Sequence, residues 1–145
     1  MNIIEKTALS WLGTRFHYYG RIKRNSLNMG GVDCIGLIIE IGKEIESKYN
    51  GKNIKYYDYL TYSRYPNVGE MKRFLDKYFI KIDKQQLSVG DLIYFNFHNH
   101  LEHIAVYISN NSIVHCSSST RKVIQEPFGK YWREKVIGWY RYKLL

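Results

Sequence analysis

The chain has 145 residues, of which 45% are hydrophobic and 24% are charged, and its formal net charge is +9. These values exclude an intrinsically disordered chain and predict a single folded domain over residues 1–145 that buries a core without disulfide bonds. The positive charge predicts attraction to polyanions such as nucleic acid, anionic membranes or acidic wall polymers, but it does not choose among them.

The N-terminal segment MNIIEKTALSWLG lacks the features of a signal peptide. It has no basic lead, and Glu5 and Lys6 interrupt its apolar residues. No stretch of the chain approaches the roughly 20 apolar residues of a membrane span. We therefore expect synthesis in the cytoplasm as a soluble protein, with another route to any target outside the cell.

Three amphipathic segments predict helices in the first half of the chain. Residues 2–12 carry apolar side chains at helical spacing, and residues 34–48 repeat isoleucine at the same spacing. A third helix is expected over residues 68–78, after Pro66. Asp33 immediately precedes the second helix and is a good N-cap residue for it.

The second half changes to short runs of β-branched and aromatic residues separated by turn residues. These predicted strands are residues 91–97, 104–109, 112–116, 122–126 and 136–142. Helices followed by neighbouring strands predict an α+β fold, in which N-terminal helices pack on a C-terminal antiparallel sheet.

Cys34 is the candidate nucleophile. It lies in the first turn of the predicted helix 34–48, where the positive end of the helix dipole favours the thiolate. The unpaired backbone N–H groups of this turn can also hold an oxyanion. A buried structural cysteine explains the position equally well. Cys116 forms no CxxC pair with Cys34, which favours a reduced protein and leaves a single bridge open.

His103 and His115 are the candidates for the base and for the group that orients it. His103 begins one predicted strand, and His115 ends the next, at an even separation along the chain. A two-residue turn at Asn110 and Asn111 would place the imidazoles on opposite faces, whereas a loop of three or five residues would place them on one face. A lone histidine in a sheet is usually structural, but the pair together with Cys34 favours proton transfer.

Several motifs in this order resemble the NlpC-type family of papain-like cell-wall cysteine peptidases. They are GTRFHYYG followed by GGVDCIGLI, then SVGDLIYF, HIAVYIS and SIVHCS, and the likeness extends from about Ala8 to the end of the chain. The tail motifs GKYW and IGWYRY are similar to the phage-tail-associated branch of that family. The resemblance implies a papain-like fold with the nucleophile at a helix N-terminus packed on the sheet.

The resemblance also implies hydrolysis of a peptidoglycan stem-peptide amide, typically between D-glutamate and a diamino acid, with no cofactor and no metal. By matching residues, Cys34 takes the nucleophile position, His103 the base and His115 the third member of a triad. Asp33 matches an acidic residue that helps to bind the free amino end of the substrate.

Two positions depart from the family pattern. The tyrosine common in the upstream segment falls by spacing on Phe16, although Tyr18 and Tyr19 are near. The serine common after the cysteine is Ile35. Any contribution of the family tyrosine to substrate binding or to the oxyanion is therefore open in this chain.

The sequence also allows functions other than that of a cysteine peptidase. His98, His100 and His103 in FHNHLEH allow a zinc site, but a polar loop before a strand is the simpler explanation, and no second ligand cluster exists. A non-catalytic basic phage structural or nucleic-acid-binding module would use the positive charge and the tyrosines, although we expect no nucleic-acid partner. An acyltransferase would use the same thioester chemistry as the peptidase.

The likeness to the phage-tail branch bears on partners and on delivery. It implies a prophage-derived or phage protein that opens the wall locally, with phage tail proteins as partners. The protein would then reach the wall as part of a tail or after lysis, which fits the expected lack of a signal peptide.

Overall fold

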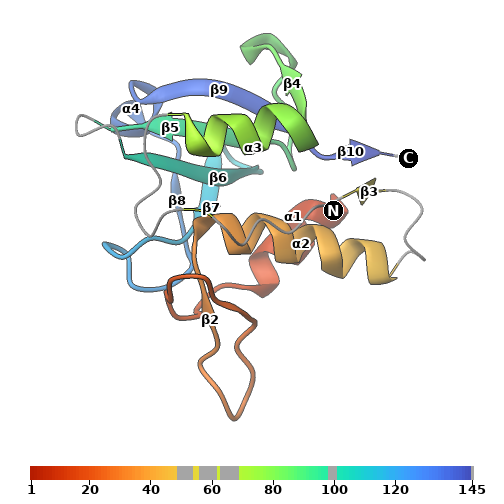
Figure 1. The fold of residues 1–145 in the computed structure, drawn as a ribbon, viewed down its shortest axis with the longest axis vertical. Coiled ribbons are helices and arrows are strands. Elements are labelled where there is room, and N and C mark those ends of the chain that lie inside the picture. Colours follow the sequence, from red (N-terminus) through yellow and green to blue (C-terminus); the bar gives the residue numbers. More distant parts are fainter. Residues whose placement is uncertain (49–53, 56–61, 63–68, 98–100, 145) are drawn as a thin grey trace.

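A computed structural model of the chain describes residues 1–48, 54–55, 62, 69–97 and 101–144. The helices are α1 (Ile3–Ser10), α2 (Cys34–Lys48), α3 (Glu70–Tyr78) and the short α4 (Lys130–Arg133), with a 3-10 turn at Lys84–Gln86. The strands are β1 (Arg21–Ile22), β2 (Gly31–Val32), β3 (Ile54–Lys55), β4 (Ile80–Ile82), β5 (Leu92–Asn96), β6 (Glu102–Ile108), β7 (Ser112–His115), β8 (Ile124–Pro127), β9 (Val136–Arg141) and β10 (Lys143–Leu144). Figure 1 shows their arrangement.

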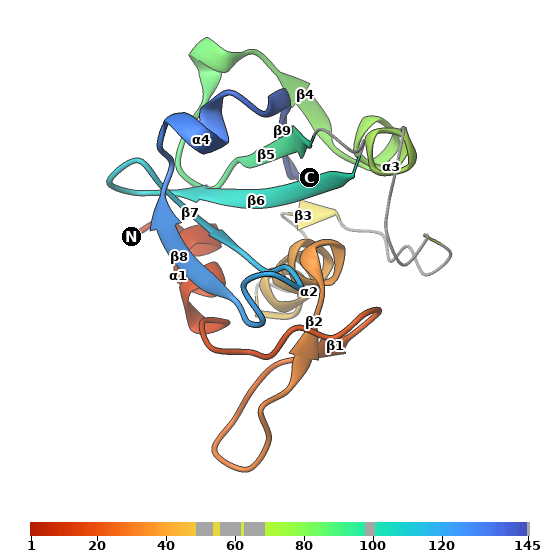
Figure 2. The same cartoon turned by 90° about the vertical axis from the view of Figure 1, so that its left-hand side faces the viewer.

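The main sheet has the strand order β4-β9-β5-β6-β7-β8, and every neighbouring pair is antiparallel. Helices α1 and α2 pack on each other and on β6 (Figures 1 and 2). The predicted α+β architecture, with helices first and an antiparallel sheet after them, is confirmed. The sequence did not predict β4, which pairs with β9, or the two-residue pairs β1–β2 and β3–β10.

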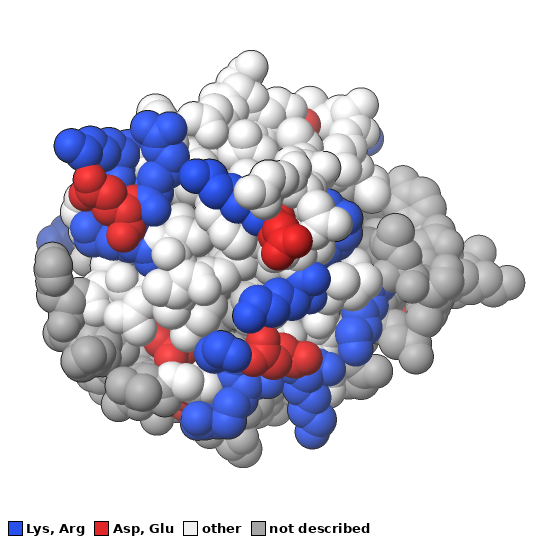
Figure 3. Space-filling view, turned by 90° about the horizontal axis from the view of Figure 1, so that it is seen from above, with Lys and Arg blue, Asp and Glu red and all other residues white. Residues whose placement is uncertain are grey.

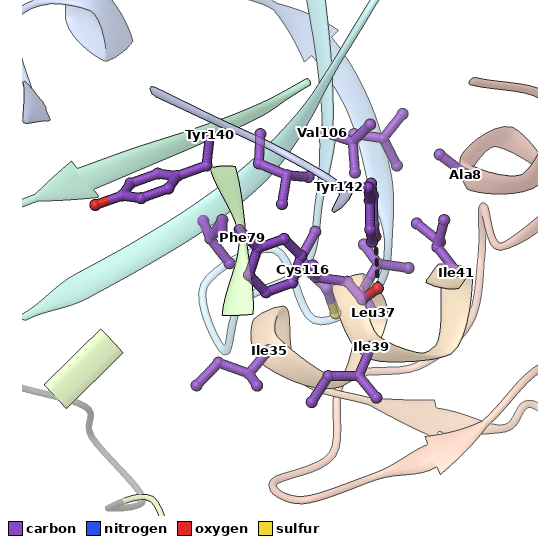
Figure 4. Packing of buried hydrophobic residues seen from close by; sticks show 14 of the residues in the cluster. Ala8, Ile35, Leu37, Ile39, Ile41, Phe79, Val106, Cys116, Tyr140 and Tyr142 are labelled. Carbon is purple, nitrogen blue, oxygen red and sulfur yellow. Dashed lines mark hydrogen bonds between the residues drawn. The ribbon is translucent and has the colours of Figure 1, made fainter. Parts of the chain in front are cut away.

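The main hydrophobic core lies between the helices and one face of the sheet. α2 is buried on most of its surface, because isoleucines occur on nearly every side of it. Figure 4 shows Ile39 and Ile41 of α2 near Tyr142, whose hydroxyl donates a hydrogen bond to the carbonyl oxygen of Ile38 at 2.5 Å. Cys116 lies in this core with no exposed surface. This agrees with the alternation along its strand, which places it opposite His115.

A second apolar cluster lies on the other face of the sheet. Its buried members are Ile93, Phe95, Ala105, Ile113 and Phe128. The side chain of Trp132, from α4, packs against this cluster. The sheet is therefore covered on both faces near the strands that carry the candidate histidines.

The hairpin between β6 and β7 decides where these histidines point. Ile108 pairs with Ser112, so the loop consists of the residues 109–111. Asn110 and Asn111 both adopt positive φ, at 62° and 50°, which asparagine tolerates better than most residues. The loop thus has an odd number of residues, as a shared face for His103 and His115 requires.

Candidate active site

One pocket, of about 390 Å³, brings together the first residue of α2, the start of β6 and the end of β7. The predicted residues Cys34, His103 and His115 all line it, and so does Asp33. The site therefore draws on both halves of the chain, with the sulfur coming from the helical part and both imidazoles from the sheet.

Cys34 is partly exposed at the start of α2. Burial of the thiol raises its pKa far above the ordinary value of 9.0, and the Asp33 carboxylate raises the pKa further. Hydrogen bonds from the backbone N–H groups of Ile104 and Ile35 lower the pKa, but by less. The pKa of the thiol is therefore raised, whereas the sequence predicted that the helix N-terminus would lower it.

The two imidazoles are directly hydrogen-bonded. Nε2 of His103 lies 2.9 Å from Nδ1 of His115, and the ring planes are nearly perpendicular, at 80°. Both residues are buried, with exposed fractions of 4% for His103 and 0% for His115. Burial lowers the pKa of His103 well below 6.5, and the neighbouring His115 lowers it further. His103 is therefore neutral near pH 7 and able to accept a proton.

Glu126, on β8, extends the hydrogen-bond chain beyond the two histidines. Its Oε2 lies 2.6 Å from Nε2 of His115, and its Oε1 accepts a hydrogen bond from Nε1 of Trp132 at 3.0 Å. Burial lowers the pKa of His115, while the Glu126 carboxylate acts in the opposite direction. Sequence reasoning missed both Glu126 and Trp132. The signal in the sequence was the alternation of the predicted strand 122–126, which ends on a carboxylate.

The Asp33 carboxylate is already bonded to groups of the protein itself. Oδ1 accepts from the backbone N–H of Gly36 at 2.7 Å, which caps α2 as predicted. Oδ2 accepts from the N–H of Tyr19 at 2.8 Å and from the Tyr62 hydroxyl at 2.5 Å, and Nη1 of Arg21 lies 3.5 Å from Oδ1. Substrate binding by Asp33 stays a prediction, in which the substrate amine would share oxygens with these donors.

Aromatic side chains form part of the pocket wall. Phe16 and Tyr18 both line it and contact each other edge-on, with ring centroids 4.8 Å apart. Tyr131 and Trp132 of α4 also line it, and Tyr131 is 59% exposed. Phe16, which occupies the position of the family tyrosine, therefore faces the pocket without a hydroxyl of its own.

A metal centre finds no support among the described residues, which contain no group of three or more His, Cys, Asp or Glu arranged to hold an ion. His98 and His100 of the alternative zinc site lie outside the described residues. No described helix has the length and hydropathy of a membrane-spanning segment.

Comparison with known proteins gives a family match along most of the chain. Residues 13–141 match the model of the NlpC/P60 family. The chain is 29% identical over 122 residues to the "Probable endopeptidase NlpC homolog" of Haemophilus influenzae, covering 84% of this chain and 52% of that protein. It is 26% identical over 125 residues to the "Murein DD-endopeptidase MepS/Murein LD-carboxypeptidase" of Escherichia coli K12, covering 86% and 54%. The chain spans about half the length of these curated relatives.

Solved structures share the fold. An NlpC/P60 family protein from Bacillus cereus superposes with a TM-score of 0.65 at 25% identity, over 97% of this chain and 39% of that chain. RipD from Mycobacterium tuberculosis, described as a non-catalytic NlpC/p60 domain protein adapted to peptidoglycan binding, superposes with a TM-score of 0.57 at 18% identity, over 97% of each chain. Because the fold also serves a non-catalytic protein, the side chains of the pocket must carry any argument about catalysis.

Proposed function

Because the chain belongs to the NlpC/P60 family, we propose that it is a cysteine peptidase that hydrolyses amide bonds in peptidoglycan stem peptides. The observation that carries this proposal is the meeting of Cys34, His103 and His115 in one pocket, with the two imidazoles hydrogen-bonded to each other. A thiol, a neutral imidazole and a group that orients the imidazole are the parts that nucleophilic amide cleavage needs.

The first half of the reaction forms a thioester. His103 accepts the proton of Cys34 as the sulfur attacks the amide carbon, so charge separation occurs only during attack. The backbone N–H groups at the start of α2 stabilise the negative oxygen of the tetrahedral intermediate. His103 then gives the proton to the amide nitrogen, the carbon–nitrogen bond breaks, and the amine product leaves.

The second half hydrolyses the thioester. A water molecule attacks the acyl carbon while His103 removes one of its protons, and the sulfur leaves and regains that proton. The acid product is then released, and the enzyme returns to its starting state. An acyltransferase would differ at this step alone, since an amine would replace the water.

The bond between D-glutamate and a diamino acid is the proposed target, with the free amino end of the peptide held near Asp33. This part of the proposal is supported by the resemblance of the motif GGVDCIGLI and by the place of Asp33 in the pocket. The name of the Escherichia coli relative describes other bonds, those of a DD-endopeptidase and an LD-carboxypeptidase. The bond therefore has to be identified from the products.

The decisive experiment incubates purified peptidoglycan with the wild type and with Cys34→Ala, and analyses the released muropeptides by mass spectrometry. We expect the wild type to release fragments that end in D-glutamate, and Cys34→Ala to release none. Cys116→Ala is the matched thiol control and should remain active, because Cys116, although it borders the pocket, is fully buried and its thiol donates to the carbonyl oxygen of Val32. Full activity of Cys34→Ala would refute the proposed nucleophile, and cleavage at another bond would refute only the specificity.

A nucleic-acid-binding module is the main competitor of a different class. It would need basic side chains gathered along one surface. On the face shown in Figure 3, lysine and arginine are interspersed with aspartate and glutamate and are separated by uncharged surface. On this face, the pattern favours general attraction to anionic polymers over a defined nucleic-acid groove.

Delivery by a phage tail is also part of the proposal. It is supported by the similarity of GKYW and IGWYRY to the phage-tail-associated branch, with tail proteins as partners and local action on the wall. Immunodetection of the protein in purified particles, followed by a zymogram of those particles, tests it. Absence of the protein from particles of a producing phage would refute this route.

A further inference from the structure

Glu126 ends a continuous hydrogen-bond chain that starts at His103. Its carboxylate lies between two N–H donors, Nε2 of His115 at 2.6 Å and Nε1 of Trp132 at 3.0 Å. The β7–β8 pairing explains the geometry, because His115 pairs with Ile124, and Glu126 follows two residues later on the same face. The contact is thus a diagonal cross-strand pair built into the sheet.

The carboxylate determines where the protons of both imidazoles lie. An ionised carboxylate only accepts hydrogen bonds, so Nε2 of His115 carries a proton and Nδ1 of the same neutral ring is an acceptor. Nε2 of His103, at 2.9 Å from that acceptor, must then be the donor. Nδ1 of His103 is left without a proton and can receive the one from Cys34.

We propose that Glu126 is a positioning residue that fixes the tautomers of His115 and His103, so that His103 presents an unprotonated Nδ1 to Cys34. The proposal rests on the proposed function, since it takes His103 as the base. Glu126 acts through His115 and touches neither the substrate nor the nucleophile. It also supplies a fixed negative charge that stabilises the imidazolium formed when His103 takes up the proton.

Trp132 holds the Glu126 carboxylate in position. Its indole donates to Oε1 of Glu126, and its ring packs against both imidazoles, with centroids 4.9 Å from His115 and 5.9 Å from His103. The Glu126 side chain is 31% exposed, so water can solvate the lone pairs that the protein does not use. His115 and Trp132 therefore hold the carboxylate by hydrogen bonds, while water solvates its remaining lone pairs.

Glu126→Gln is an informative variant because glutamine has one acceptor oxygen for two N–H donors. If the amide oxygen faces Trp132, the amide NH₂ faces His115 and forces its proton from Nε2 to Nδ1. Nδ1–H of His115 then donates to Nε2 of His103, so the proton of His103 moves to Nδ1 and the base is lost. Trp132→Phe removes the competing donor, so in Glu126→Gln/Trp132→Phe the amide oxygen is free to face His115.

The experiment compares the wild type, Glu126→Gln, Trp132→Phe and the double variant in two ways. Nitrogen-15 NMR of the histidine side chains gives the tautomers, and stem-peptide cleavage gives kcat and KM. We expect Nε2–H tautomers for both histidines in the wild type. In Glu126→Gln, kcat should fall at least about tenfold with little change in KM, and the tautomers should shift. The double variant should regain the kcat of Trp132→Phe.

Each other outcome overturns the inference. Unchanged kcat and tautomers in Glu126→Gln would show that the carboxylate does not set the protonation, and a loss that Trp132→Phe does not relieve would indicate a merely structural role. Nδ1–H tautomers in the wild type would refute it without any variant. If the wild type cleaves no stem peptide, the proposed function fails, while the NMR comparison still decides the role of Glu126.

Discussion

At Cys34, two electrostatic effects oppose each other, and their magnitudes decide the protonation state. The helix N-terminus stabilises a negative charge by about 0.3–1 kcal/mol, which corresponds to well under one pKa unit. Burial of an ionisable group shifts its pKa by up to about 3–5 units. Burial is the largest cause of the raised pKa of Cys34, and the Asp33 carboxylate adds to it. The sequence revealed the helix but not how deeply the thiol would be buried.

The reactivity of the free thiol should follow from this raised pKa. We expect alkylation of Cys34 by iodoacetamide to be slow at neutral pH and to accelerate beyond the ordinary thiol pKa of 9.0, because only the thiolate reacts. Mass spectrometry of peptides labelled over a pH series measures the rate at each cysteine. Cys116, whose pKa burial also raises and whose side chain has no exposed surface for the reagent to reach, is the internal control and should react more slowly still. Rapid labelling of Cys34 at pH 7 would contradict the prediction.

His103 should set the acid limb of the pH–rate profile. The active form of a base is the deprotonated one, and burial, followed by the electrostatic interaction with His115, lowers the pKa of His103 well below 6.5. A lowered pKa keeps the base deprotonated at a pH where an ordinary histidine is already charged. We therefore expect kcat/KM to fall only below pH 6.5, as measured by stem-peptide cleavage from about pH 4 to about pH 8. An acid limb centred above 6.5 would contradict this assignment of the base.

At the scale of elements, periodicity predicted the helices 34–48 and 68–78 and the strands of the sheet well. It could not predict β4 or the pairs β1–β2 and β3–β10, because two or three residues carry no measurable period. It left the length of the loop between β6 and β7 open, although that length decides which face His115 occupies. The register is selected by which side chains pack on each face of the sheet, and that packing is a property of the whole fold.

The loop between β6 and β7 should be sensitive to side chains that disfavour positive φ. Asn110 has a φ of 62°, where a β-branched residue is strained and glycine is not. We expect Asn110→Val to lower the free energy of unfolding by about 1–2 kcal/mol. Asn110→Gly should leave it nearly unchanged. Urea denaturation of both variants measures the difference, and a valine variant as stable as the glycine variant would show that the positive φ at this position carries no energetic cost.

Helix α3 depends on a cap that comes from another element. Its N-cap residue is Gly69, which has no side chain, and Glu102 of β6 accepts hydrogen bonds from the backbone N–H groups of Gly69 and Met71 instead. We expect Glu102→Ala to lower the free energy of unfolding by about 1–3 kcal/mol, since it leaves N–H groups unpaired near the core.

Glu134→Ala is the matched control for Glu102→Ala. Glu134 is 61% exposed, and its carboxylate lies 3.8 Å from Nζ of Lys130, so its removal should change the free energy of unfolding by less than about 0.5 kcal/mol. Urea denaturation compares the two variants. Equal losses would mean that the Glu102 cap contributes no more than an exposed surface pair.

At the scale of the molecule, the candidate site exists only where the two halves of the fold meet. Cys34 belongs to a helix that forms the core, and His103 and His115 belong to the sheet that packs on it. Sequence motifs could indicate these residues one by one, because each has a local signature at the end of a helix or strand. The contact between Glu126 and Trp132 joins β8 to α4, and although the alternation of residues 122–126 placed Glu126 on one face of a strand, it did not reveal this partner.

The net charge should influence encounter with the wall more than the chemical step. The formal charge is +9, but among the described residues no lysine or arginine lines the pocket, and the nearby Arg21 is paired with Asp33. Salt screens charges further apart than about 8 Å at physiological ionic strength. We therefore expect added sodium chloride to raise KM for intact, anionic walls several-fold and to leave kcat nearly constant. An uncharged stem-peptide fragment is the control, and its KM should not respond to salt. If salt changed kcat for this fragment, the charges would act on the chemical step in the pocket, which would contradict the prediction that they affect only binding to the wall.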